Sequence, residues 1–166
     1  MTREEFIALV KGEQEGLRRF LLALCLGNRD EADDIAQDTL VKAYLSCAGY
    51  QDFCLRDESK GKFTAWLYTI AHRTFLDHKK TSRTTEPLEA LERATDHSFD
   101  ADSGFRYQEL YAALATLPPK ERTSILLFYL KGYSIREISK IIECSEDAVK
   151  KQLSRGREQL RNMIKR

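Results

Sequence analysis

The sequence predicts an all-α protein: two small helical domains joined by a flexible linker, with a helix-turn-helix in the second domain. Apolar residues recur three and four positions apart over most of the chain, which is the spacing of the buried face of a helix. Residues that cap or stop helices separate these stretches, as at Ser134 and Pro118-Pro119. With 42% hydrophobic and 32% charged residues, and with 8 Gly and 3 Pro among 166 residues, the composition is that of a globular chain.

Residues 1–81 predict three helices that bury one another's apolar faces in a small bundle. The first opens at a capping box, Thr2–Glu5, and Gly27 is expected to close it in a left-handed conformation. The second starts near Asp30, because acidic residues favour the positive end of the helix dipole. A loop, Cys47–Lys62, then leads to the third helix. The side chains expected to face the core are Phe6, Leu9, Val10, Leu17, Phe20, Leu21, Leu24, Ala32, Ile35, Ala36, Leu40, Ala43, Tyr44, Phe63, Trp66, Leu67, Ile70, Ala71 and Phe75.

Residues 82–102 are rich in Thr, Asp, Glu and Ser and poor in large apolar residues, so they predict a flexible linker. Residues 103–166 predict a second domain of four helices. Pro118-Pro119 ends the first of these at Leu117 and starts the next. The side chains expected inside are Tyr107, Leu110, Tyr111, Leu114, Ile135, Ile138, Ile141, Ile142, Val149, Leu153, Leu160 and Ile164.

The strongest local signal is the unit Ser134–Arg157, which reads as a helix-turn-helix. Ser134 caps a short helix, a tight turn at Glu143–Ser145 follows, and a long basic helix ends the unit. In such a unit the second helix presents its first turns to base edges in the major groove. Two packed helices are common in all-helical proteins, but residues 117–166 hold twelve basic and six acidic side chains, which favours DNA.

The third helix is a second candidate surface, because it mixes aromatic and basic side chains as single-stranded nucleic acid requires. Aromatic residues at helical spacing are more often core, and this alternative holds for Phe63, Trp66 and Phe75. On spacing alone, the side chains expected outside are Tyr68, Arg73, Lys79 and Lys80.

Several function classes lack their signatures. The sequence has no phosphate-binding glycine loop and no nucleophile or metalloprotease motif, so neither catalysis nor a cofactor is expected. No apolar run is long enough to cross a bilayer, and no secretory signal begins at Met1. Cys47 and Cys54 fit no metal-ligand spacing; a redox or zinc role with a histidine is the alternative to free structural thiols.

Three motifs in order resemble the sigma factors of bacterial RNA polymerase. Glu31–Tyr44 (EADDIAQDTLVKAY) resembles the helix that binds core polymerase, and Phe63–Asp77 (FTAWLYTIAHRTFLD) resembles the helix that reads and melts the minus-ten element. Leu117–Arg122 (LPPKER), Gly132–Ile138 (GYSIREI) and Ser145–Arg157 resemble the minus-thirty-five domain. Their order, spacing and short length match the extracytoplasmic-function (ECF) group.

The resemblance implies a subunit that binds core RNA polymerase and directs promoter-specific initiation in the cytoplasm, with no catalysis of its own. It assigns polymerase binding, at the clamp helices, to Asp34, Gln37, Asp38 and Lys42. It assigns minus-ten recognition to Arg73, Asp77, Lys79 and Lys80. It assigns minus-thirty-five recognition to Ser145, Glu146, Lys150, Lys151, Ser154, Arg155 and Arg157.

The family also implies further contacts and partners. The loop Tyr50–Lys62 lies where sigma factors capture a flipped base of the melted non-template strand, and Leu126–Leu130 lies where they pack on the polymerase flap. An anti-sigma factor is an expected partner. The rival interpretation is a DNA-binding regulator that uses its N-terminal bundle for dimerisation or ligand sensing, but such a protein has no reason to carry both N-terminal motifs.

The chain departs from the family pattern at three positions. Ser139 stands where many members have Ala, which a bond from its hydroxyl to the preceding turn would accommodate. Glu143 stands at a turn position that is often Gly, so a positive φ there would be strained. Gly156 lies inside the last helix, at a cost of about 1 kcal/mol relative to Ala.

Overall fold

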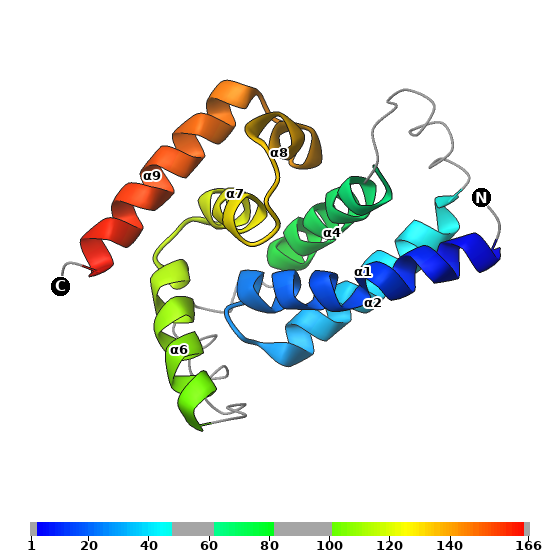
Figure 1. The fold of residues 1–166 in the computed structure, drawn as a ribbon, viewed down its shortest axis with the longest axis horizontal. Coiled ribbons are helices and arrows are strands. Elements are labelled where there is room, and N and C mark those ends of the chain that lie inside the picture. Colours follow the sequence, from blue (N-terminus) through cyan, green and yellow to red (C-terminus); the bar gives the residue numbers. More distant parts are fainter. Residues whose placement is uncertain (1–2, 48–61, 82–100, 165–166) are drawn as a thin grey trace.

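A computed structural model describes residues 3–47, 62–81 and 101–164, and the regular structure within these ranges is entirely α-helical, as predicted. The helices are α1 (Arg3–Leu24), α2 (Arg29–Leu45), α4 (Lys62–Thr81), α6 (Ala101–Ala115), α7 (Pro119–Tyr129), α8 (Ile135–Ile141) and α9 (Glu146–Ile164). In Figure 1, α1, α2 and α4 form one group and α7, α8 and α9 a second, with α6 beside both.

Several predictions fall outside the described residues. These are the capping residue Thr2, most of the loop Tyr50–Lys62, the linker up to residue 100, Cys54 and His97. The side chains of Tyr107 and Ile164 are also outside the described part of the structure.

The helix ends follow the local sequence signals. Leu26 and Gly27 both have positive φ, 58° and 83°, and the Gly27 N–H donates to the Leu22 carbonyl at 2.8 Å, so α1 closes in a left-handed turn. Asn28 then caps α2 by accepting from the Glu31 N–H at 3.2 Å. The predicted left-handed Gly27 and the start of the second helix near Asp30 are therefore confirmed to within a residue.

The C-terminal helices also begin where predicted. Pro119 occupies the first turn of α7, where a missing N–H costs nothing. The Ser134 hydroxyl accepts from the Glu137 N–H at 3.1 Å and caps α8, and the Ser145 hydroxyl accepts from the Ala148 N–H at 3.1 Å at the start of α9. The predicted helix-turn-helix is present.

The two groups of helices share one continuous hydrophobic core rather than two. Helix α4 packs against α8, and α1 packs against α7. Tyr68 lies at this junction: it is fully buried, with its ring edge-on to Phe20 at 5.0 Å and to Tyr133 at 6.1 Å. The expectation that Tyr68 lies outside is wrong, because the C-terminal helices cover the side of α4 that its own bundle leaves open.

Arg122 joins the two groups from inside the core. Arg122 is only 6% exposed, and its guanidinium donates to the carbonyls of Leu114, Leu117 and Leu24, at 3.1, 3.1 and 3.0 Å. These carbonyls lie at or just beyond the C-terminal ends of α6 and α1, where the helix dipole favours a cation. Burial lowers the pKa of Arg122 from its ordinary value.

Most of the described residues predicted for the core are buried or half-buried, and three are exposed. Leu9, Tyr44 and Leu110 are 39%, 46% and 46% exposed. Each sits on the edge of an apolar stripe, and periodicity alone does not fix how wide a stripe the neighbouring helices cover.

The three departures each have a structural basis. The Ser139 hydroxyl donates to the Arg136 carbonyl at 2.6 Å, one turn back. Glu143 has φ of +58°, and the Cys144 N–H donates to the Ser139 carbonyl, so Glu143 holds the left-handed position of a Schellman helix end. A Cβ on Gly156 would lie 2.8 Å from Cγ1 of Ile125, so glycine permits close packing of α9 on α7.

Candidate functional site: one protein-binding and two nucleic-acid-binding faces

Helix α9 presents a polar face that the rest of the fold leaves uncovered. Val149 and Leu153 are buried against the core, which fixes the rotation of the helix about its axis. The opposite side is exposed and carries the side chains expected to read duplex DNA, namely Ser145, Glu146, Lys150, Lys151, Ser154 and Arg155.

Two contacts to α7 fix the position of α9. The Ser124 hydroxyl donates to Oε1 of Gln152 at 2.6 Å. Nε of Arg157 donates to the Tyr129 hydroxyl at 2.7 Å, and the guanidinium lies over the rings of Phe128 and Tyr129 at 5.2 and 5.5 Å. The structure therefore places Arg157 apart from the other α9 candidates, half-buried against α7.

Helix α2 carries the candidate polymerase-binding residues on one exposed face. Asp34, Gln37, Asp38 and Lys42 are all exposed, as the spacing predicts. The same face also carries two exposed apolar side chains, Val41 at 58% and Leu45 at 76%. Val41 and Leu45 continue the series Asp34 and Asp38 in steps of three and four residues, which places all four on one side of the helix. Our sequence-based predictions did not use this pattern.

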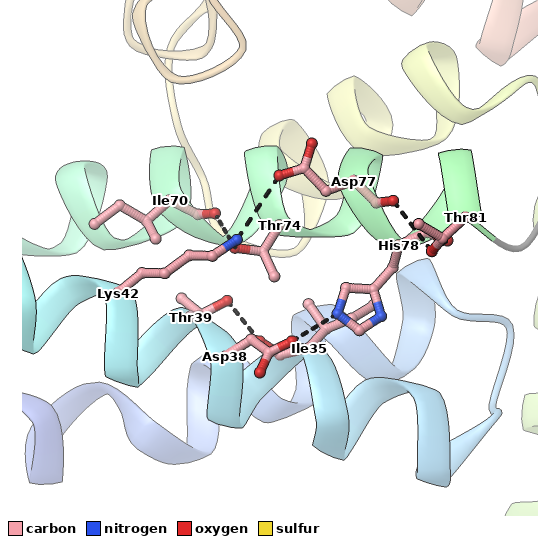
Figure 2. Close-up of polar contacts among 9 residues, drawn as sticks. All are labelled: Ile35, Asp38, Thr39, Lys42, Ile70, Thr74, Asp77, His78 and Thr81. Atoms are coloured by element: carbon pink, nitrogen blue, oxygen red, sulfur yellow. Dashed lines mark hydrogen bonds and ion pairs between the residues drawn. The ribbon is translucent and has the colours of Figure 1, made fainter.

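Ion pairs join the exposed face of α2 to the last turns of α4 (Figure 2). Nε2 of His78 lies 2.8 Å from Oδ2 of Asp38. Nζ of Lys42 lies 3.7 Å from Oδ2 of Asp77 and 3.4 Å from Oγ1 of Thr74. The candidate polymerase-binding and minus-ten residues therefore pair with one another or with immediate neighbours.

A further pair extends this contact. Nζ of Lys79 lies 3.1 Å from Oε1 of Glu31, and the side chains are 35% and 19% exposed. Both pairs are long-range: packing brings His78 and Lys79 to Asp38 and Glu31 from a helix forty or more residues further along the chain, which spacing within α2 does not encode.

One minus-ten candidate contacts the C-terminal half instead. Nη2 of Arg73 donates to Oε1 of Glu143, in the turn between α8 and α9. Both side chains are more than half exposed, at 60% and 53%. Of the four minus-ten candidates, Arg73, Asp77 and Lys79 are thus engaged in ion pairs, and Lys80 is exposed at the end of α4.

Beside Arg73 lies a buried titratable side chain. His72 is 6% exposed, and among the described residues its Nδ1 has no hydrogen-bond partner. Burial, together with the neighbouring charge of Arg73, lowers the pKa of His72 to about 4. His72 is therefore neutral and helps to build the core.

The described residues were also searched for metal ligands, reactive thiols and membrane-spanning helices. In the ranges that the structure describes, no three His, Cys, Asp or Glu side chains gather as a metal site would require. Cys25, Cys47 and Cys144 are free thiols, and burial raises the pKa of Cys25 and of Cys144. None of the described helices is both long and apolar enough to span a bilayer.

Comparison with known proteins gives the same order of regions. Residues 9–85 match the family described as Sigma-70 region 2, and residues 107–160 match Sigma-70 region 4. The chain is 30% identical to ECF RNA polymerase sigma factor SigW of Bacillus subtilis, over 99% of this chain and 97% of that protein. It is 28% identical to EcfG of Rhodopseudomonas palustris, over 98% and 84% of the respective chains.

A solved structure shows the same arrangement. The chain resembles the sigma factor RpoE of Bartonella quintana, solved in complex with the anti-sigma factor NepR, with a TM-score of 0.73, 26% identity and 98% of each chain covered. The order of the matched regions and the helical fold define a bacterial sigma factor. The chain belongs to the extracytoplasmic-function group of RNA polymerase sigma factors, the subunits that bind core polymerase and direct it to promoters.

Proposed function

We propose that α2 is the polymerase-docking helix, through Asp34, Gln37, Asp38 and Lys42. The observation that carries this proposal is that all four are exposed on one face of a helix whose other face is buried. Val41 and Leu45 add exposed apolar area to that face, and apolar side chains inside a charged rim are the usual composition of a protein-binding surface. An acidic face repels DNA and suits a protein partner.

We propose that the two DNA elements are read by different helices. The exposed face of α9 reads the minus-thirty-five duplex in the major groove, through Lys150, Lys151, Ser154 and Arg155 with Ser145 and Glu146 at its start. Arg157 supports α9 from the side of α7 and contributes positive charge. Arg73, Asp77, Lys79 and Lys80 on α4 contact the minus-ten element, where melting exposes single-stranded DNA.

The division into residues 1–81 and 103–166 with a linker at 82–102 suits this function, since a tether lets both elements be engaged at once and adds their contacts through effective concentration. Of the stretch Leu126–Leu130, Leu126 and Leu127 are buried, so the side chains available to the polymerase flap are Tyr129 and Leu130, which are 60% and 49% exposed. The chain supplies specificity and no catalysis, and it acts in the cytoplasm, where polymerase and promoters are.

We also propose that an anti-sigma factor holds this chain inactive. The support is the Bartonella sigma factor, which matches nearly the whole chain and was solved with the anti-sigma factor NepR. Such a partner would compete with core polymerase for the chain.

Co-migration with bacterial core RNA polymerase on size exclusion tests the docking helix. We expect the wild-type chain to co-migrate and Asp38→Ala to lose most of the complex. His78→Gln is the matched control, because it breaks the same ion pair but leaves the Asp38 carboxylate for polymerase. Normal binding by Asp38→Ala, or equal loss in both variants, would contradict the docking role of Asp38.

Promoter use tests the two DNA-contacting faces. Lys151→Ala and Arg155→Ala should each reduce transcription from a cognate promoter by about tenfold, since one DNA contact is worth about 1–3 kcal/mol. Arg161→Ala, with an equal charge change near the end of α9, is the control. Equal effects at all three positions would show that only net charge matters.

A further inference from the structure

The contact between Arg73 and Glu143 joins a residue proposed to contact minus-ten DNA with the turn of the helix-turn-helix. Arg73 lies on α4 and Glu143 lies between α8 and α9, so the pair links the N-terminal and C-terminal halves of the chain. The pair sits at the outer edge of the packed contact between α4 and α8. Whatever separates these helices also separates the two charges.

The backbone at Glu143 is unusual for its residue type. Its φ of +58° is the left-handed conformation, which glycine adopts freely and which costs a residue with a Cβ about 1–2 kcal/mol. The hydrogen bond from the Cys144 N–H to the Ser139 carbonyl requires that conformation, whichever residue occupies the position. The turn gains nothing from a glutamate, and the carboxylate that a glutamate supplies is directed at Arg73.

A carboxylate and a phosphate compete for the same guanidinium. A carboxylate is planar and a phosphate is tetrahedral, but each offers two oxygens that accept N–H donors from the arginine fork. Arg73 has Glu143 as its partner while the two halves are packed, so a DNA phosphate must displace that carboxylate.

We propose that Glu143 is a positioning residue that acts through Arg73: in the free chain its carboxylate occupies Arg73 as a phosphate would, and so withholds it from DNA. The inference rests on the proposed minus-ten role of Arg73. It adds that access to this face is governed from the recognition turn of the other half. An exposed pair of this kind contributes modestly, so the effect on DNA affinity is about two- to fivefold.

The test uses the full chain and a fluorescein-labelled single-stranded oligonucleotide of mixed sequence, with binding followed by fluorescence anisotropy at low salt. Glu143→Gln keeps the strained backbone and removes the charge, whereas Glu143→Gly removes both. We expect both variants to bind the oligonucleotide about two- to fivefold more tightly than wild type. Only Glu143→Gly should raise the melting temperature, because only it relieves the left-handed strain.

Two controls isolate the route through Arg73. Glu158→Gln makes the same change in net charge on α9 and should give a smaller gain in affinity than Glu143→Gln. On an Arg73→Gln background, Glu143→Gln should no longer tighten binding beyond the gain from Glu158→Gln.

The outcomes separate cleanly. Equal binding by wild type and Glu143→Gln, including the case in which neither binds, overturns the inference. So does a gain that matches Glu158→Gln, that persists without Arg73, or that follows the melting temperature rather than the charge. Co-migration with core polymerase is measured separately. A failure of this inference and a failure of the proposed function can therefore be told apart.

Discussion

Helices α4 and α9 both carry residues proposed to contact DNA, and they differ in what these residues already contact. On α4, Arg73, Asp77 and Lys79 are held in ion pairs with other helices or turns. On α9, Lys150 and Lys151 are exposed, and no ion pair forms on them within the described part of the chain. If the proposed roles hold, the face of α9 is exposed to DNA in this conformation, whereas the ion pairs of α4 must break before its side chains contact DNA.

The position of each helix in the fold explains this difference. Helix α4 lies in the middle and packs against α1, α2 and α8 (Figure 1), and its charged side chains meet charges from α2 and from the turn after α8. Helix α9 lies at the edge, packs chiefly on α7 and α8, and leaves one long side uncovered. A central helix gains stability from its neighbours, and its functional side chains acquire partners there.

The largest predicted effect tests what holds the two halves together. Arg122→Leu removes three hydrogen bonds from a buried site, including the one to Leu24 that crosses between the halves. We expect the free energy of unfolding to fall by about 3–5 kcal/mol, because the variant leaves three buried carbonyl groups without their hydrogen-bond donor. Urea denaturation followed by circular dichroism measures it.

The control for this variant is Arg136→Leu, in which an exposed arginine of α8 is replaced by the same residue. It should change the free energy of unfolding by less than about 0.5 kcal/mol. A similar loss in both variants would mean that Arg122 adds no more than a surface charge does.

The next effect concerns pH and the buried side of α4. His72 has a pKa of about 4 when folded and near 6.5 when unfolded, so the unfolded chain binds the extra proton between these values. Stability from this group is therefore complete above about pH 6.5 and is lost as the pH falls towards about 4, by about 2–3 kcal/mol. Denaturation of wild type and His72→Gln across this range gives the contribution by difference. A parallel pH dependence in the two proteins would contradict it.

A smaller effect tests how closely α9 is seated. Gly156→Ala would place a Cβ 2.8 Å from Cγ1 of Ile125, and the resulting strain exceeds the gain in helix propensity, for a net loss of about 1–2 kcal/mol. Gly12→Ala is the matched control, since nothing lies within 4 Å of its Cβ and the change should stabilise α1 by up to about 1 kcal/mol. Thermal unfolding of both variants checks the opposite signs.

The same contrast shows how far sequence reasoning reaches. Helix caps such as Ser134 and buried stripes such as Val149 and Leu153 are local patterns, and the structure confirms them. The exposed face of α9 could also be predicted, because burying one side of a helix leaves the opposite side exposed. The sequence also anticipated a strained left-handed position at Glu143, since turn chemistry is local too.

The features that the sequence did not predict lie where helices from different parts of the chain pack together. Tyr68 was expected outside because periodicity describes one buried face, and α4 has a second partner in the C-terminal half. The pairs of Asp38 with His78 and of Arg73 with Glu143 depend on how two helices cross, which spacing along one helix does not encode. Arg122 is buried for the same reason: its acceptors come from the ends of two different helices.

The smallest predicted effect tests the comparison of α4 and α9 directly. Lys151→Ala should weaken binding of the free chain to a mixed-sequence duplex by about fivefold and reduce the salt dependence by about one counterion, because an exposed lysine is available to phosphate. Lys79→Ala removes an equal charge, but Lys79 already has Glu31 as its partner at 3.1 Å, so the loss should be less than about twofold. Anisotropy titrations at several salt concentrations measure both. Equal losses would show that the ion pairs of α4 do not withhold it from DNA, and the difference between the two helices would then be one of packing alone.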